Sequence, residues 1–186
     1  DRVPVMLHNF MMAAREAGFT MRRFREDPAA VAESFVRAVE TYGYDGVLVD
    51  VDTATLAEAL GVRVDHPEDQ PARWAGPAIG SLAAVRDLPP ADLVGHPRVR
   101  VWLEAVRLLK ARFGGQVFVR GNCDQAPFSL ASMVRGPEDW MMDLLDEGSR
   151  EDAHALLGRC ADAGTSFIRL MAEAGADMVS NGDSPA

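Results

Sequence analysis

The chain has 186 residues, of which 48% are hydrophobic and 25% are charged, and its formal net charge at pH 7 is −9. This composition is ordinary for a globular protein with a substantial core, while the negative charge argues against nucleic acid or an anionic membrane as a partner, because both need a basic surface. No run in the sequence approaches the roughly 20 apolar residues of a membrane span, so a small-molecule substrate is the expected partner.

Four short apolar runs alternate with longer segments of helical periodicity. We expect strands at residues 3–8, 46–52, 117–121 and 176–180. Short runs rich in valine and leucine are typical of parallel strands that are covered on both faces. The sequence therefore predicts an α/β fold with a parallel sheet built from strand–helix units.

The segments between these strands carry signals for helix ends. Asp27 and Pro28 are typical of an N-cap and a first-turn proline, and Gly43 is typical of the end of the same helix. An apolar stripe at helical spacing over residues 99–113 predicts a second long helix. Residues 149–152 resemble a capping box, which predicts that Ser149 caps a third long helix.

Residues 62–97 have a different composition, because prolines punctuate a polar stretch. We expect them to form a long, structured excursion after the second strand–helix unit. Excursions of this length inside a compact domain are often functional. The whole of residues 1–186 is otherwise expected to belong to a single domain.

An open doubly wound sheet and a barrel both fit this pattern, and four strands would be half of a barrel. Half of a barrel leaves two open edges and an uncovered apolar interior, so we expect missing sequence or a partner surface, with a homodimer as one assembly. The chain begins with Asp1 and not with methionine. We therefore expect a fragment or a trimmed chain.

Each predicted strand finishes in polar side chains. Catalytic and binding residues gather at the carboxyl ends of the strands in parallel α/β folds. We therefore predict an active-site cleft at this edge of the sheet. The candidate residues there are His8, Asn9, Asp50, Asp52, Asn122, Cys123, Asp124, Asp183 and Ser184.

Each candidate also has a structural interpretation. Asp52 could be the N-cap of the next helix, or a carboxylate that orients N–H donors of a substrate. Asp50 would share a face of an extended strand with Asp52, which would raise the pKa of one of the two. His8 could be a core histidine, a general acid or base, or a hydrogen-bond donor.

The thiol and hydroxyl candidates are similarly open. Cys123 could be a nucleophile or a small buried hydrophobe, and Ser184 lacks the glycine context of a nucleophile elbow, so that binding is its expected role. Cys123 and Cys160 lie far apart and outside metal-type spacing. A disulfide framework is not expected, and the reducing cytoplasm is the predicted location.

Several strings, in the right order along the whole chain, resemble the uroporphyrinogen decarboxylase superfamily. They are Arg2-Val3-Pro4-Val5, Tyr42-Gly43-Tyr44-Asp45-Gly46, Ala126-Pro127-Phe128-Ser129-Leu130-Ala131, and Ala174-Gly175-Ala176-Asp177 followed by Asp183-Ser184-Pro185-Ala186. The resemblance implies a (β/α)8 TIM-type barrel, of which about the first four βα units are present.

The resemblance also implies roles for site residues. Asp52 matches the aspartate that binds the pyrrole nitrogens in the decarboxylase, Ser184 matches its substrate-contacting serine, and Ser132 stands where its active-site tyrosine lies. Phe128 belongs to the loop string shared by the superfamily. We expect catalytic roles for Asp52, His8 and Asp183. The expected substrate-binding residues are Asn9, Asn122, Cys123, Asp124, Phe128, Ser132 and Ser184.

One departure from the decarboxylase pattern favours another branch. Asn9 and Ala13 stand where the decarboxylases carry two arginines that hold the substrate carboxylates. Losing two cationic anchors removes charge-assisted hydrogen bonds that a polycarboxylate needs. The strings are more similar to those of the methylcobalamin:coenzyme M methyltransferases and their relatives.

The resemblance therefore implies a zinc-dependent corrinoid or thiol methyltransferase-like enzyme, with a corrinoid carrier protein as a candidate partner. In that branch the zinc ligands belong to the C-terminal half, so we assign no metal ligand and no cofactor to this chain. Two alternatives stay open. One is uroporphyrinogen III decarboxylase, a cofactor-free enzyme, in which Arg15, Arg22 or Arg23 would replace the lost anchors. The other is a non-catalytic half-barrel binding or scaffold protein.

Overall fold

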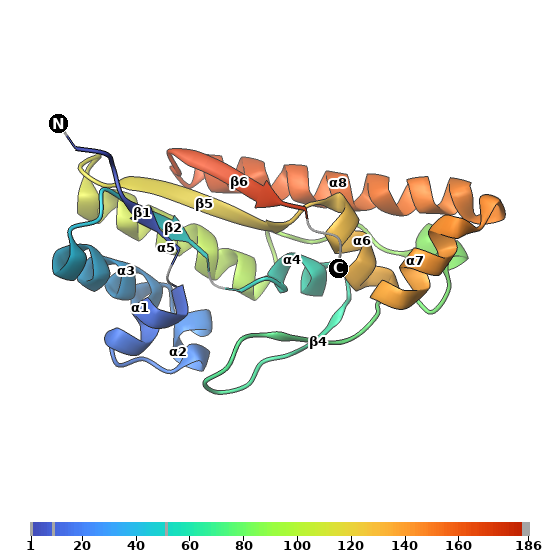
Figure 1. The fold of residues 1–186 in the computed structure, drawn as a ribbon, viewed down its shortest axis with the longest axis horizontal. Coiled ribbons are helices and arrows are strands. Elements are labelled where there is room, and N and C mark those ends of the chain that lie inside the picture. The colour runs from blue at the N-terminus through green and yellow to red at the C-terminus, as the bar shows by residue number, and fades with distance from the viewer. Residues whose placement is uncertain (1, 9, 51, 184–186) are drawn as a thin grey trace.

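A four-stranded parallel sheet organises the chain in the computed structural model, which describes residues 2–8, 10–50 and 52–183. Its strands are β1 (Met6–Leu7), β2 (Gly46–Val49), β5 (Phe118–Gln125) and β6 (Met178–Gly182), and they lie side by side in this order (Figure 1). All three pairings are parallel, so the carboxyl ends of the strands meet at one edge. Sequential parallel strands of this kind build (β/α)8 barrels.

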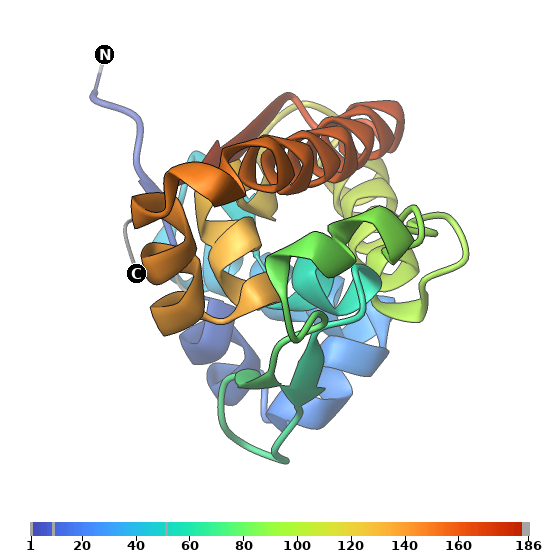
Figure 2. The same cartoon turned by 90° about the vertical axis from the view of Figure 1, so that its right-hand side faces the viewer.

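Helices connect the strands and cover one face of the sheet. Helices α1 (Phe10–Glu16), α2 (Met21–Glu26) and α3 (Pro28–Tyr42) follow β1, α4 (Thr55–Ala59) and α5 (Pro97–Phe113) precede β5, and α6 (Pro127–Arg135), α7 (Pro137–Leu145) and α8 (Arg150–Glu173) precede β6. Helix α5 packs against both α3 and α8, and Figure 2 shows the three around one side of the molecule. Within residues 2–8, 10–50 and 52–183, no helix has both the length and the apolar character that a transmembrane span requires.

The two helix-end predictions for α3 are confirmed, and the capping-box prediction is wrong. The Asp27 carboxylate accepts the Ala29 N–H at 2.9 Å, and Gly43 ends the helix with a φ of 68°. Ser149 makes no cap; its hydroxyl donates to Asp146 Oδ2 at 2.9 Å. Asp146 instead caps the 3-10 helix η2 (Glu147–Ser149), which holds Ser149 in helical backbone geometry.

Alternation along the strands separates an outer face from an inner face. Val47, Val119 and their in-phase neighbours are buried against the helices. Met6, Phe118 and Met178 point to the other side and are 36, 42 and 47% exposed. Because side chains alternate along a strand, the polar residues in phase with this second set lie on the inner face of the half-barrel.

The strand bounds differ from those predicted because side chains replace ladder hydrogen bonds at the strand ends. Residues 2–5 are extended but unpaired in the sheet, and the Asp45 carboxylate accepts the Val5 N–H at 2.7 Å. Asp177 likewise accepts the Val119 N–H at 2.8 Å, ahead of β6. Strand β5 runs on to Gln125, past an irregularity in its pairing with β6.

The excursion at residues 62–97 contains its own small elements. Strands β3 (Arg63–Asp65) and β4 (Arg73–Gly76) form an antiparallel pair, and the 3-10 helix η1 (Leu82–Asp87) follows them. The pair projects from the lower side of the molecule in Figure 1. Trp74 Nε1 donates to the Met133 carbonyl at 2.8 Å, which attaches the excursion to α6.

Close packing of α8 on the sheet needs a residue without a side chain. A Cβ atom at Gly121 would lie 2.9 Å from the Met171 methyl group, so glycine at this position lets α8 approach β5. Farther along α8, Phe167 meets Trp102 of α5 edge to face, with ring centroids 5.6 Å apart. Both rings are fully buried.

Replacing Phe167 with alanine should test this packing. Because the ring is fully buried, we expect Phe167→Ala to lower the free energy of unfolding by about 3–5 kcal/mol. Thr165→Ala replaces an exposed side chain on the same helix. It should change the free energy of unfolding by less than about 0.5 kcal/mol. Urea denaturation of the two variants measures both values, and equal effects would contradict the assigned core.

Candidate functional site

A histidine–aspartate pair lies at the carboxyl ends of β1 and β2. His8 Nε2 is 2.6 Å from Asp50 Oδ2, and the side chains are 49% and 1% exposed. Asp50 thus lies behind the imidazole, while the imidazole faces solvent. The contact orients the ring and leaves Nδ1 as the nitrogen that can exchange a proton with a ligand. His8 also stacks on Phe10, with ring centroids 5.2 Å apart.

His8 and Asp50 each change the pKa of the other through the hydrogen bond between them. The hydrogen bond to Asp50 raises the pKa of His8 above 6.5, although burial and the nearby Arg120 oppose this shift. Burial raises the pKa of Asp50, and the bond to His8 and the amide of Asn122 oppose it. Asp50 Oδ1 is buried and accepts no hydrogen bond of good geometry. The arrangement is suited to general acid–base chemistry.

Asp124 is another deeply buried carboxyl at this edge. Its φ is +59°, a conformation that aspartate tolerates better than most residues. One carboxyl oxygen accepts the Leu56 N–H at 3.2 Å, and the other is buried without a partner. Burial raises its pKa well above the usual value of 3.8, and the negative charge of Asp52 adds to this effect. Asp124 therefore joins β5 to α4 through the Leu56 N–H, in surroundings that favour its protonated form.

Asp52 caps α4, which is the structural interpretation that the sequence leaves open for it. Its Oδ1 accepts the backbone N–H groups of Ala54 at 2.9 Å and Thr55 at 2.8 Å. The Thr55 hydroxyl bonds to both oxygens, at 2.9 and 3.1 Å. With 4% of its surface exposed, Asp52 has little capacity left for a substrate.

Asp183 has the corresponding role at α6. Its oxygens accept the N–H groups of Phe128 at 3.2 Å and Ser129 at 2.8 Å, as well as the Ser129 hydroxyl. Phe128 packs edge to face on the buried Trp140, 6.0 Å away. Asp183 thus positions the start of α6, and its expected catalytic role stays a prediction.

The remaining candidates divide between the two faces of the sheet. Asn122 is half-buried on the inner face. Cys123 is fully buried on the helix side, and burial raises the pKa of its thiol to about 12, which argues against the nucleophile interpretation. Ser132 is buried in α6. Asn9 and Ser184 lie outside the described residues.

Arg120 belongs to the inner face, and sequence reasoning missed it. It is half-buried in the middle of β5, and its Nε donates to the Ser180 hydroxyl at 2.9 Å. The sequence does contain a signal for this position. Side chains alternate along a strand, so Arg120, two residues after the exposed Phe118, lies on the same inner face.

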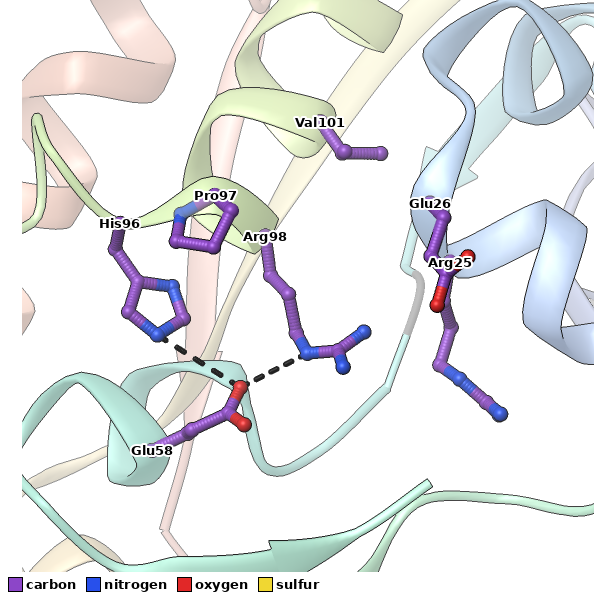
Figure 3. A pocket seen from close by; sticks show the side chains of 7 residues that line it. All are labelled: Arg25, Glu26, Glu58, His96, Pro97, Arg98 and Val101. Carbon is purple, nitrogen blue, oxygen red and sulfur yellow. Dashed lines mark hydrogen bonds and ion pairs between the residues drawn. The ribbon is translucent and has the colours of Figure 1, made fainter. Parts of the chain in front are cut away.

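A separate cavity of about 400 Å³ lies behind α4, between α2 and the first turn of α5. Figure 3 shows Glu58 at one side of it, where Oε2 is 2.8 Å from Arg98 Nε and 3.7 Å from His96 Nε2. Glu58 Oε1 is also 3.1 Å from His66 Nε2 in the excursion. Arg25, which also lines the cavity, donates to the backbone carbonyls of Pro67 and Gln70. We interpret Glu58 as a structural hub for the excursion.

The described residues do not form a metal centre by themselves. Within residues 2–8, 10–50 and 52–183, no group of three or more His, Cys, Asp or Glu side chains could hold a metal ion. Cys160 is buried like Cys123, and burial raises its thiol pKa to about 12 as well.

Comparisons with known proteins agree on one family. The family model for uroporphyrinogen decarboxylase (URO-D) matches residues 1–186. A uroporphyrinogen decarboxylase of Rhodococcus opacus is 28% identical over 91% of this chain and 51% of its own length. A methylcobamide:CoM methyltransferase, MtaA, of Methanosarcina barkeri is 26% identical over 90% of this chain and 49% of its own length.

The structural comparison shows the fold. A methyltransferase from Methanosarcina mazei superposes with a TM-score of 0.86 at 21% identity, covering 98% of this chain and 54% of that chain. The chain thus has the α/β arrangement of about half of a (β/α)8 barrel. It also spans about half the length of the curated relatives it matches.

The protonated state of Asp124 predicts a pH dependence of stability. Because the folded protein holds this proton to a higher pH than the unfolded chain, the free energy of unfolding should fall as the pH rises above about 4. Asp124→Asn mimics the neutral acid and should remove this loss. The variant should therefore gain stability over the unmodified protein, and this gain should grow as the pH rises above about 4.

Thermal unfolding at several pH values measures this difference. Asp87→Asn, at an exposed position in η1, is a matched control that should not change the pH profile. If Asp124→Asn and the unmodified protein follow the same curve, Asp124 does not carry a raised pKa in the folded state.

Proposed function

Because the chain belongs to the URO-D family, we propose that it supplies the strand-end site of an enzyme of that superfamily, and that this enzyme transfers a methyl group to a thiol rather than decarboxylating a porphyrinogen. One observation carries the choice. The two positions where the decarboxylases hold arginines are Asn9 and Ala13, and Ala13 is buried in α1. A polycarboxylate would lack its cationic anchors at these positions.

The surroundings of Asp52 support the same choice. In the decarboxylases the matching aspartate binds pyrrole nitrogens, but here both carboxylate oxygens already accept hydrogen bonds from the start of α4. Two of the three replacement arginines are also engaged. Arg22 pairs with Glu68 at 3.0 Å, and Arg23 lies 4.3 Å over the Phe19 ring.

The pair of His8 and Asp50 has a direct use in the proposed reaction. Methyl transfer to a thiol forms a carbon–sulfur bond, breaks the bond between the methyl group and its donor, which keeps that bond's electron pair, and releases the thiol proton, which His8 can accept through Nδ1. The buried Asp50 holds the ring in the matching orientation and stabilises the imidazolium that results. In this role His8 only accepts a proton, and Asp50 only positions the imidazole ring.

Zinc and a corrinoid carrier protein as partner are parts of this proposal that rest on the family resemblance. A cytoplasmic location is also part of it and rests on the two free, buried cysteines. The methyltransferase among the relatives supports the reaction class. The decarboxylase among them keeps decarboxylation as the alternative outcome of the test.

The proposal predicts thiol-dependent demethylation of methylcobalamin by the purified protein, with 2-mercaptoethanesulfonate as the test thiol. Uroporphyrinogen III should lose no carboxyl group under the same conditions. His8→Gln should lower the demethylation rate about 10²- to 10⁴-fold, the usual contribution of a general base. His154→Gln, at an exposed position on α8, should retain the full rate. Decarboxylation of the porphyrinogen would overturn the proposal, and the absence of both reactions would favour a binding or scaffold protein.

The His8–Asp50 contact also predicts how the rate depends on pH. A base must be neutral, so the rate should rise with pH through the pKa of His8, which lies above 6.5. Asp50→Asn removes the hydrogen bond to a carboxylate that raises this pKa. The acidic limb of the rate profile should therefore move to lower pH in the variant, with a lower plateau. An unmoved limb would show that another group titrates.

A further inference from the structure

Arg120 occupies the middle of the inner face of the half-barrel. In the sheet register it lies opposite Leu48 of β2 and Met178 of β6. Its in-phase neighbours on β5 are Phe118 and Asn122, and neither is buried, whereas the alternate residues are buried against the helices. The side chain therefore extends into the space that the curved sheet partly surrounds.

The guanidinium leans toward the carboxyl ends of the strands. Its Nε donates to the hydroxyl of Ser180, which lies two residues beyond Met178 along β6. The charge is close enough to His8 to act against protonation of the imidazole. Ser180 thus holds the guanidinium beside the His8–Asp50 pair and uses one of its five N–H donors.

No carboxylate compensates this charge among the described residues, since no Asp or Glu oxygen in that part of the chain lies within 4.0 Å of the guanidinium. Arg98, by contrast, pairs with Glu58 at 2.8 Å and Arg135 with two aspartates at 2.6 and 2.7 Å, while the buried Arg25 donates to the backbone carbonyls of Pro67 and Gln70. A partly desolvated cation with apolar neighbours is unfavourable unless an anion meets it.

We propose that Arg120 binds the acidic group of the substrate, and that the substrate is a small molecule with one carboxylate or sulfonate. The free terminal nitrogens of a guanidinium match such a group with two parallel hydrogen bonds. An acid held there would place the rest of the molecule toward His8. This inference rests on the proposed function only in placing the substrate at the same edge of the sheet.

Binding of three matched thiols tests the proposal without any methyl transfer. Calorimetric titration compares 2-mercaptoethanesulfonate and 3-mercaptopropionate, which are anionic, with the neutral 2-mercaptoethanol. The unmodified protein should bind the two acids more tightly than the alcohol. Arg120→Met should weaken binding of the acids about 10- to 100-fold, the usual worth of hydrogen bonds to a charged group, and should leave the alcohol unchanged.

Two further variants keep the test decisive if Arg120→Met fails to fold. Arg120→Lys retains the charge without the two-pronged geometry, and Ser180→Ala frees the guanidinium from its anchor, so both should weaken binding of the acids by less than Arg120→Met. Arg107→Met, on the exposed side of α5, is the control and should bind all three thiols normally.

The outcomes separate this inference from the proposed function. Equal binding of acids and alcohol to the unmodified protein, no binding of either acid, or acid binding unaffected by all three site variants would overturn the role of Arg120. Acid binding that depends on Arg120, in a protein that transfers no methyl group, would uphold this inference and refute the proposed function alone.

Discussion

The hydrogen-bonded register of the four parallel strands is the constraint on which the site depends. Leu48, Arg120 and Met178 lie opposite one another across three strands, and Asn122 lies opposite Ser180 one inward-facing step farther along. A slip of one residue in any strand would turn its polar side chains toward the helices. The site is therefore assembled by backbone pairing before any polar contact forms.

Three neighbouring carboxyls at the strand ends would repel one another if all were equally ionised. The structure resolves this conflict in three different ways. Asp52 is satisfied by the N–H groups that begin α4, Asp50 is paired with His8, and Asp124 retains its proton. Like charges in a buried cluster push pKa values apart. One edge of the sheet thus contains a fixed cap, a charged pair and a neutral acid.

The sequence predicted the main helices and strands well, because apolar periodicity and helix-ending glycines depend on residues that are close together in the chain. It could not choose between the two interpretations of Asp52, since a cap and a substrate ligand need the same residue after a strand. Cys123 could have been assigned to the helix side by its phase with Val119, once the strand was known to extend so far. Arg120 was missed because strands of a parallel sheet were expected to be covered on both faces, which left no place for an interior cation. Ser149 was misjudged because Asp146, three residues earlier, competes for its hydroxyl.

Glu58 links the excursion to the strand-end site through its hydrogen bonds and ion pairs. One carboxylate joins His66 of the excursion to Arg98 at the start of α5, and it belongs to the same short helix that Asp52 caps. The antiparallel pair, α4 and the first turn of α5 therefore form one cooperative unit, which should exchange its amide protons together rather than fray piece by piece. A ligand that ordered the far tip of the excursion would be sensed at the strand ends through this helix, without touching them.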